Sequence, residues 1–387
     1  MSYYIERDIT PILKSVPESK ASVLLGVRQA GKSTLCRHLI EGRKAAIYSG
    51  DEPRDVRILS AVESKAELEK IIGSNEIVFI DEAQRIPSIG LLIKRLVDLK
   101  TKCKVIVTGS SSLELAGGIF ESAAGRTDTT YLAPFSIQEL VNHYSLPKVM
   151  QDLPDRLVYG NFPFVLDEPM RAQKNLMEYF NSVVFKDIFS LSDVRRPQQL
   201  IDLVRIIARN IGSVVSYDSL SRDTGLSKTA VTNYLTLLEE CFIIKILPSY
   251  AKNLENELKK SKKIYFCDVG LRNAAIRDFS PFLSRTPEEQ GVLLENFFII
   301  ERMKKIYLSD QYAEQYFWRT KNKEEVDFVE FENSKPKAFE VKLSKSNVRA
   351  PASFSRAYPE MEFHTVNKDN ILEYLVDSVA ANGTEPA

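Results

Sequence analysis

Residues 24–35 read LLGVRQAGKSTL, in which two glycines, a lysine and a serine follow an apolar run. Gly26, Gly31, Lys32 and Ser33 fit the spacing G-x-x-x-x-G-K-[ST]. In this motif the backbone curls so that its N–H groups point at phosphate oxygens, beside the positive end of the next helix. Lysine contacts the terminal phosphates and serine holds Mg²⁺. The spacing predicts a phosphate-binding loop made of Gly26, Val27, Arg28, Gln29, Ala30, Gly31, Lys32, Ser33 and Thr34.

An acidic pair ends the apolar stretch EIVFIDEAQ, where Asp81 and Glu82 are neighbours. At the carboxyl edge of a sheet these side chains would face bound phosphates. We expect Asp81 to join Ser33 as a ligand of Mg²⁺, and Glu82 to orient and polarise an attacking water. Without the glycine loop, such a pair is as typical of a helix N-terminus, where the dipole favours negative charge.

Three further candidates follow before residue 134. The stretch KVIVTGSS carries Thr108 and Ser110, whose hydroxyls could bond the same water or the γ-phosphate, the alternative being a turn after a buried strand. Arg126 precedes the next strand. Its guanidinium could reach a phosphate of its own chain or of a neighbouring subunit, or lie as a solvated surface charge. With Lys32 and Glu82, these residues are the catalytic candidates.

The elements that must position these residues follow from the apolar pattern. Between about residues 21 and 134, β-rich apolar runs alternate with amphipathic helical stretches, which predicts a parallel sheet covered by helices on both faces. We assign residues 1–134 to a P-loop core. In residues 135–194 helical patterns replace the strands, and we expect a helical lid there.

Residues 195–250 have the layout of a winged helix-turn-helix: a helix around 217–223, a turn at Gly225, a longer helix from Ser227 and a strand-like run. Lys228 is the only basic residue of the second helix before Glu239, and basic side chains supply much of the affinity for DNA. Duplex binding and protein contact or bracing therefore both stay open. The lysine run in ELKKSKKIYF could add charge, although such a run is by default a solvated connector.

The remaining residues predict a second site. In residues 251–378, Glu295 lies on an amphipathic helix, Asp327 on a strand, and Glu340 and Lys342 on one face of another strand, with Val341 toward the core. Acids in this order, followed by lysine, resemble the PD-(D/E)XK nuclease fold, a restriction-endonuclease-like α/β domain. There the carboxylates bind Mg²⁺ and the lysine stabilises or positions the attacking water. Residues 379–387 have the composition of a frayed tail.

The N-terminal motifs, in their order, resemble the AAA+ class of ATPases, in which the second acid activates water and an arginine often acts in trans. The stretches YIERDI, LAPFSIQEL and YGNFPFVL resemble a bacterial and archaeal family of ATP-binding proteins that joins such an ATPase to a C-terminal region of unknown function. Asn161 departs from that family, which commonly has glycine there. The resemblance implies ATP and Mg²⁺, and the guanine-selecting N-K-x-D motif is approached only by NKDN at Asn367.

Composition limits the function classes. The chain has 387 residues, room for two or three domains, and 52 basic against 52 acidic residues, so any contact with nucleic acid needs a local patch. No apolar run suits a membrane span, and four scattered cysteines fit a reduced cytoplasm. Two functions follow: an ATPase that controls a nuclease acting on DNA or RNA, or an ATP-driven switch or scaffold whose nuclease-like domain only binds a protein or nucleic-acid partner. Both are compatible with a homo-oligomer. A small-molecule kinase is a third, weaker hypothesis.

Overall fold

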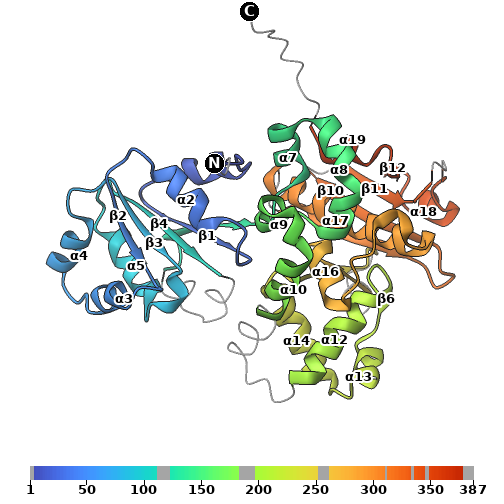
Figure 1. Ribbon diagram of the computed structural model, residues 1–387, viewed down its shortest axis with the longest axis horizontal. Helices are drawn as coiled ribbons and strands as arrows, with labels where there is room; N and C mark the ends of the chain where they lie inside the picture. Colours follow the sequence, from blue (N-terminus) through green and yellow to red (C-terminus); the bar gives the residue numbers. More distant parts are fainter. Residues whose placement is uncertain are drawn as a thin grey trace, which may run out of the picture.

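The computed structural model describes residues 4–110, 123–182, 197–251, 261–309, 312–332, 335–344 and 348–377. Figure 1 shows two lobes, with the N-terminal sheet and its helices in one and the later helices and sheets in the other. The expected tail at residues 379–387 lies outside the described residues. No helix within the described ranges is both long and apolar enough to cross a membrane.

The N-terminal lobe contains the expected parallel sheet. Its five strands run in the order β2-β3-β4-β1-β5, and every neighbouring pair is parallel. The strands are β1 (Ala21–Gly26), β2 (Ala45–Ser49), β3 (Ile77–Asp81), β4 (Lys104–Gly109) and β5 (Thr127–Leu132). Because β4 lies between β1 and β3, the segments that follow these three strands meet at one edge of the sheet.

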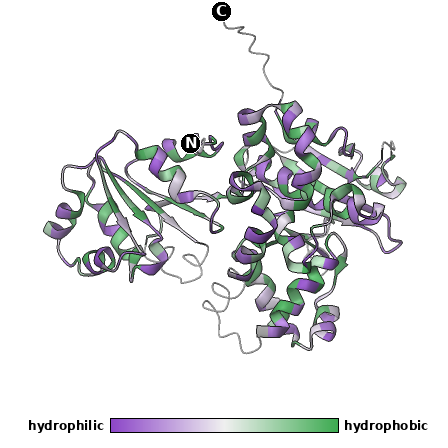
Figure 2. Cartoon of the chain, in the orientation of Figure 1, coloured by the Kyte–Doolittle hydropathy of each residue, from purple (hydrophilic) through white to green (hydrophobic). Residues whose placement is uncertain are grey.

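Both faces of this sheet are buried, as a parallel sheet requires. Leu24 belongs to one hydrophobic core, whereas its neighbours Val23 and Leu25 belong to the other. Figure 2 shows the corresponding concentration of hydrophobic residues on the strands. The covering elements are α1 (Thr10–Ser15), α2 (Lys32–Ile40), α3 (Pro53–Ser60), α4 (Lys65–Ile72), the 3₁₀ helix η1 (Ala83–Arg85) and α5 (Ile89–Asp98).

Helices follow β5, as the helical pattern predicted, and we call them the lid helices, although their role as a lid stays a prediction. They are α7 (Ile137–Tyr144), α8 (Leu146–Tyr159), α9 (Pro163–Asp167), the 3₁₀ helix η2 (Pro169–Arg171) and α10 (Ala172–Ser182). A capping box fixes the start of α7, since the Ser136 hydroxyl accepts from the Glu139 N–H and the Glu139 carboxylate accepts from the Ser136 N–H.

The helix pair predicted in the middle of the chain is confirmed. Helix α13 (Tyr217–Thr224) ends at Gly225, and Ser227 caps α14 (Lys228–Glu240). They follow α12 (Pro197–Arg209) and the short strand β6 (Val214–Val215), and precede β7 (Ile244–Pro248) and β8 (Lys262–Phe266). The three strands form an antiparallel sheet in the order β6-β8-β7. Strand β8 lies beyond the domain boundary expected at residue 250, but it pairs with β6 and β7, which lie before that boundary.

The C-terminal elements form a four-stranded sheet in the order β12-β11-β10-β9. Phe298 of the long helix α17 packs with Phe328 and Phe339 on one face, and Trp318 packs with Phe354 on the other. The elements are α16 (Val269–Ile276), the 3₁₀ helix η4 (Phe282–Ser284), α17 (Pro287–Ser309), β9 (Glu314–Arg319), β10 (Glu325–Glu332), β11 (Lys335–Val341), α18 (Ala352–Ala357), β12 (Glu362–Val366) and α19 (Ile371–Leu375).

Close packing between the lid and α16 predicts the effect of one substitution. Gly160 has φ +70, and a Cβ there would collide with the Asp268 carboxylate, which accepts from the Asn161 and Gly270 N–H groups. We expect Gly160→Ala to lower the free energy of unfolding by about 2 kcal/mol or more.

Gly42→Ala is the matched control, because Gly42 has φ +74 and nothing within 4 Å of an added Cβ. It should cost only about 1 kcal/mol, for the left-handed backbone alone. Urea unfolding followed by circular dichroism measures both, and equal midpoints for the two variants would contradict the packing described.

Candidate functional site

The glycine loop joins the end of β1 to the start of α2, so the strand and helix expected around it are confirmed. Gly31 is the N-cap of α2 with φ +94, and Gln29 also has a left-handed backbone at φ +58. Gly26 has φ +150, and a Cβ there would collide with the Leu132 carbonyl. Glycine at 26 and 31 is therefore a condition for the observed curl.

Lys32 lies inside this curl. Its Nζ donates to the carbonyl oxygens of Gly26 and Val27 at 3.0 and 2.9 Å, and the residue is 5% exposed. Burial lowers the pKa of Lys32, while the carboxylates of Glu82 and Asp81 act in the opposite direction. The ammonium is thus held at the loop, beside the acidic pair.

Asp81 brings the ends of three elements together. The Ser33 hydroxyl, on α2, donates to Asp81 Oδ1 at 2.9 Å, and the Thr108 hydroxyl, on β4, donates to the same oxygen. Mg²⁺ prefers hard oxygen ligands such as carboxylate and hydroxyl groups. The chemistry of this donor set therefore fits Mg²⁺, with Ser33 and Asp81 as its protein ligands.

Glu82 is held by a network that includes a residue the sequence analysis left unassigned. Its backbone is left-handed at φ +50, and its carboxylate accepts from Gln84 Nε2 at 2.5 Å. Gln84 Oε1 in turn accepts from the Ser110 N–H at 3.3 Å, and the Glu82 N–H donates to the Thr108 hydroxyl at 3.3 Å. Gln84 thus links Glu82 to the end of β4, although only a local EAQ triplet marked it in the sequence.

Arg126 lies at the opposite end of the sheet from the loop. Strand β5 pairs in parallel with β1, so Thr127 lies opposite Ala21 while Leu132 lies opposite Gly26. A six-residue strand spans about 20 Å, more than an arginine side chain can reach. Arg126 pairs instead with Asp98 at 2.9 Å. Of the three alternatives, this position favours a surface charge over a contact with a phosphate of its own chain, and action on a neighbouring subunit stays a prediction.

Two distant residues hold the loop from outside. Arg7 donates to the carbonyl oxygens of Ala30 and Ala133 at 2.8 and 2.6 Å and to Glu139 Oε1, on α7, at 3.0 Å. The Tyr179 hydroxyl, on α10, donates to the Arg28 carbonyl at 3.0 Å. The sequence pattern marked neither residue, because Arg7 is more than a hundred positions from Glu139 and Tyr179 is more than a hundred positions from Arg28.

The lid also contacts α17. The Ile137 N–H, at the start of α7, donates to Glu301 Oε2 at 2.8 Å. Asn161 Nδ2 donates to Glu301 Oε1 at 3.2 Å, and Lys304 Nζ lies 2.6 Å from that oxygen. The asparagine that departs from the family pattern thus uses its amide, which a glycine lacks, to contact α17.

The structure brings the four residues of the expected nuclease-like site together, but around a lysine. Lys342 Nζ lies 2.6 Å from Glu340 Oε1. Lys263 Nζ, on β8, lies 3.1 Å from both Glu295 Oε1 and Asp327 Oδ1, and its side chain is 1% exposed. The lysine run that contains Lys263 was interpreted as a solvated connector, and for Lys263 that interpretation is wrong.

The electrostatics of this cluster reflect burial among like charges. Burial, and next Asp327, raise the pKa of Glu295 and of Glu340 to about 7 each. Burial opposes the charge on Lys263, but the surrounding acids, Glu295 first, hold its pKa well above the ordinary value. Within the described residues no group of three or more His, Cys, Asp or Glu side chains is arranged to hold a metal ion. Glu295 and Asp327, two of the acids expected to bind Mg²⁺, are instead paired with Lys263 in this structure.

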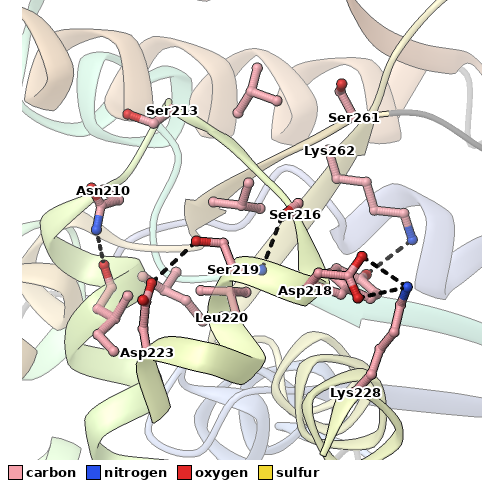
Figure 3. A pocket seen from close by; sticks show the side chains of 15 residues that line it. Asn210, Ser213, Ser216, Asp218, Ser219, Leu220, Asp223, Lys228, Ser261 and Lys262 are labelled. Atoms are coloured by element: carbon pink, nitrogen blue, oxygen red, sulfur yellow. Dashed lines mark hydrogen bonds and ion pairs between the residues drawn. The ribbon is translucent and has the colours of Figure 1, made fainter. Parts of the chain in front are cut away.

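The helix pair of the middle module borders a polar pocket of about 680 Å³ (Figure 3). Lys228 Nζ lies 3.0 Å from the Asp218 carboxylate, and Lys262 Nζ donates to the Tyr217 hydroxyl at 3.0 Å. Thr229, Thr232 and Asn233 of α14 are exposed as well. Since Asp218 already neutralises Lys228, the positive charge that this face offers to a phosphate is smaller than its sequence suggests.

Comparison with known proteins matches three consecutive segments of the chain. Residues 18–141 match the model of an AAA domain, and residues 150–281 and 290–379 match two domains of unknown function, DUF8612 and DUF4143. Together with the parallel five-stranded sheet, the first match supports an AAA-type ATPase. The descriptions of the other two families name no activity, so these matches do not show a nuclease domain.

Relatives in other organisms share most of this length. A protein of Mycobacterium tuberculosis is 26% identical over 332 residues, which cover 84% of this chain and 70% of the relative. A protein of Haemophilus influenzae is 26% identical, and the match covers 74% of this chain and 75% of the relative. A protein of Methanocaldococcus jannaschii is 24% identical, and the match covers 70% of this chain and 63% of the relative. All three bear the name uncharacterized protein.

Solved structures are only distantly similar. Bacteroides Pif1 bound to single-stranded DNA is 11% identical with a TM-score of 0.25 and covers 40% of this chain and 50% of its own. A STAND protein with a tetratricopeptide repeat sensor from Pyrococcus horikoshii is 12% identical with a TM-score of 0.29, and the match covers 81% of this chain and 51% of its own. TM-scores this low do not establish a shared fold.

The raised pKa of Glu340 predicts a pH effect. The unfolded chain releases this proton near the ordinary value of 4.5, but the folded chain holds it until about 7, so the carboxyl reduces stability as the pH rises through that window. Glu340→Gln cannot titrate, and the loss of thermal stability between about pH 5 and about pH 8 should therefore shrink. Glu360→Gln, at an exposed position, is the control. An unchanged pH profile in Glu340→Gln would contradict the assignment.

Proposed function

We propose that this chain is an ATP-driven switch, in which residues 26–34 bind the triphosphate, Ser33 and Asp81 hold Mg²⁺, and Glu82 activates the attacking water. The observation that carries the proposal is the convergence of Ser33 and Thr108 on Asp81 beside the curled loop. A glycine turn of purely structural use would not require two hydroxyls from separate elements on one buried carboxylate.

The roles of the residues follow from their contacts. Lys32 would exchange its bonds to the Gly26 and Val27 carbonyls for phosphate oxygens, which are stronger, charged acceptors. Mg²⁺, when bound, supplies positive charge to the phosphates. Gln84 restrains the Glu82 carboxylate and is a positioning residue, since it acts through Glu82. Thr108 and Ser110 fix the end of β4 beside the same acids.

The water-activating role of Glu82 gives the first test of this proposal. Glu82→Gln should leave ATP binding intact and slow hydrolysis about 10²-fold or more, because a positioned base is lost. Phosphate release measures turnover. Glu69→Gln, on the exposed side of α4, controls for the amide substitution, and Lys32→Ala should abolish turnover altogether. Hydrolysis by Glu82→Gln at the parent rate would rule out the assignment.

The switch requires a route from the nucleotide site to the C-terminal lobe. Arg7 joins the loop at Ala30 to Glu139 of α7, and Glu301 of α17 accepts from the first N–H of α7. We place the moving element at α7, because a change in the loop alters the Arg7 bonds and hence the seating of the helix. Spatial contact alone does not prove coupling, so the route needs a direct measurement.

Hydrogen exchange of the full chain provides that measurement. ATP added to the Glu82→Gln protein, which cannot turn it over, should change the exchange of amides in α7 and in α17. Arg7→Met should preserve the effect of ATP on the loop and abolish it in α7, since the guanidinium bonds are lost. Arg43→Met, which removes an exposed arginine paired with Glu76, should change neither. Equal responses in Arg7→Met and Arg43→Met would reject this route.

Of the two functions considered, the geometry favours the switch that binds over the ATPase that controls a nuclease, because the acid cluster surrounds Lys263. Nucleic acid as the partner depends on the exposed face of α14, whose Lys228 pairs with Asp218. A second copy of this chain as the partner depends on Arg126, which lies too far from its own loop to serve it. Both partners are proposals.

A further inference from the structure

Lys263 has the contacts of a resident cation. Its Nζ lies 3.1 Å from Glu295 Oε1, 3.1 Å from Asp327 Oδ1 and 2.5 Å from Glu325 Oε1. An ammonium has three N–H donors and no acceptor. Three carboxylates therefore match its whole hydrogen-bonding capacity, and the ammonium lies among the oxygens that a metal ion would need.

Two of these carboxylates, those of Glu295 and Asp327, have further hydrogen-bond donors as well. The Tyr265 hydroxyl donates to Glu295 Oε1 at 2.7 Å, and the Val341 N–H donates to Asp327 Oδ2 at 2.9 Å. A divalent ion at this position would need lone pairs that these donors occupy, and it would meet the ammonium at close range. Neither condition suits Mg²⁺, which demands near-ideal octahedral coordination.

Lys263 is not a flexible surface side chain that could leave. Strand β8 is the central strand of its sheet, and Lys263 lies opposite Val214 on β6 and Leu247 on β7. The next residue on its face, Tyr265, is fully buried and contacts the same glutamate. The backbone of Lys263 is therefore fixed by pairing on both sides, and its side chain, 1% exposed, is enclosed by the surrounding residues.

The charges of the cluster are nearly balanced without a metal. Glu295, Glu325, Asp327 and Glu340 are the acids. Lys263 pairs with the first three, Arg319 lies 3.0 Å from Glu325, and Lys342 lies 2.6 Å from Glu340. Buried carboxylates need such partners, and here the chain itself provides them.

We propose that Lys263 takes the place of a divalent metal ion in the nuclease-like domain. Its salt bridges permanently link β8 to α17 and to β10 of the C-terminal sheet. The acid cluster is then structural, and the domain does not cleave nucleic acid with a metal at these residues. These salt bridges make the middle module and the C-terminal sheet one rigid unit that the ATPase domain can move.

Binding of Mn²⁺ to the full chain tests the proposal. All variants are made in an Asp81→Asn background and measured without nucleotide, so that metal bound at the ATPase site does not contribute. In this background we expect no Mn²⁺ site that depends on Asp327. Lys263→Met, which keeps the apolar stem and removes the charge, should gain a Mn²⁺ site with an affinity at least about tenfold above any residual binding by the background, and Asp327→Asn added to it should remove that site. Calorimetry measures the affinities.

Mn²⁺ binding that is present with Lys263 intact and lost in Asp327→Asn would overturn the proposal, as would plasmid cleavage with the same dependence. A folded Lys263→Met protein without a gained site would also count against it. If Lys263→Met does not fold, the comparison of the parent with Asp327→Asn still decides. No arm of the test uses ATP, so its outcome is separate from that of the proposed switch.

Discussion

The carboxylate of Asp81 is the point on which the nucleotide site depends. It is 8% exposed, and a carboxylate so buried is tolerated only with hydrogen-bond donors around it. Ser33 and Thr108 supply them from the elements that follow β1 and form β4. This convergence requires β4 to lie between β1 and β3, so the strand order of the whole sheet is a condition for one small group of oxygen atoms.

A second constraint joins this site to the rest of the molecule. Helix α17 contacts the lid through Glu301 and the acid cluster through Glu295, six positions earlier on the same helix. Strand β8 adds Lys263 from the middle module. Strand β8, the C-terminal sheet and the helices after β5 therefore all contact α17, and polar contacts connect the nucleotide loop to this helix through Arg7, Glu139 and α7.

The sequence predicted well what depends on local spacing. The glycine loop, the helix pair around Gly225 and the alternation of Glu340 with Val341 are all set by neighbours within a few residues. The rest depends on contacts between distant segments. Arg7 is an ordinary charge until β5 and α7 fold against it, and Lys263 was assigned with the lysines around it to a connector. Its alternation with buried Tyr265 was the signal that marked it as part of a core strand.

ATP binding by the loop and its Mg²⁺ ligands is the central claim, and calorimetric titration of ATP into the full chain tests it most directly. The account predicts heat of binding with Mg²⁺ present and a weaker affinity when EDTA removes the metal. Without Mg²⁺, Asp81 and Ser33 no longer contribute to phosphate binding through a shared metal ion. Saturable binding that does not respond to Mg²⁺ would contradict the role of Asp81. The absence of any heat of binding under both conditions would contradict the account as a whole.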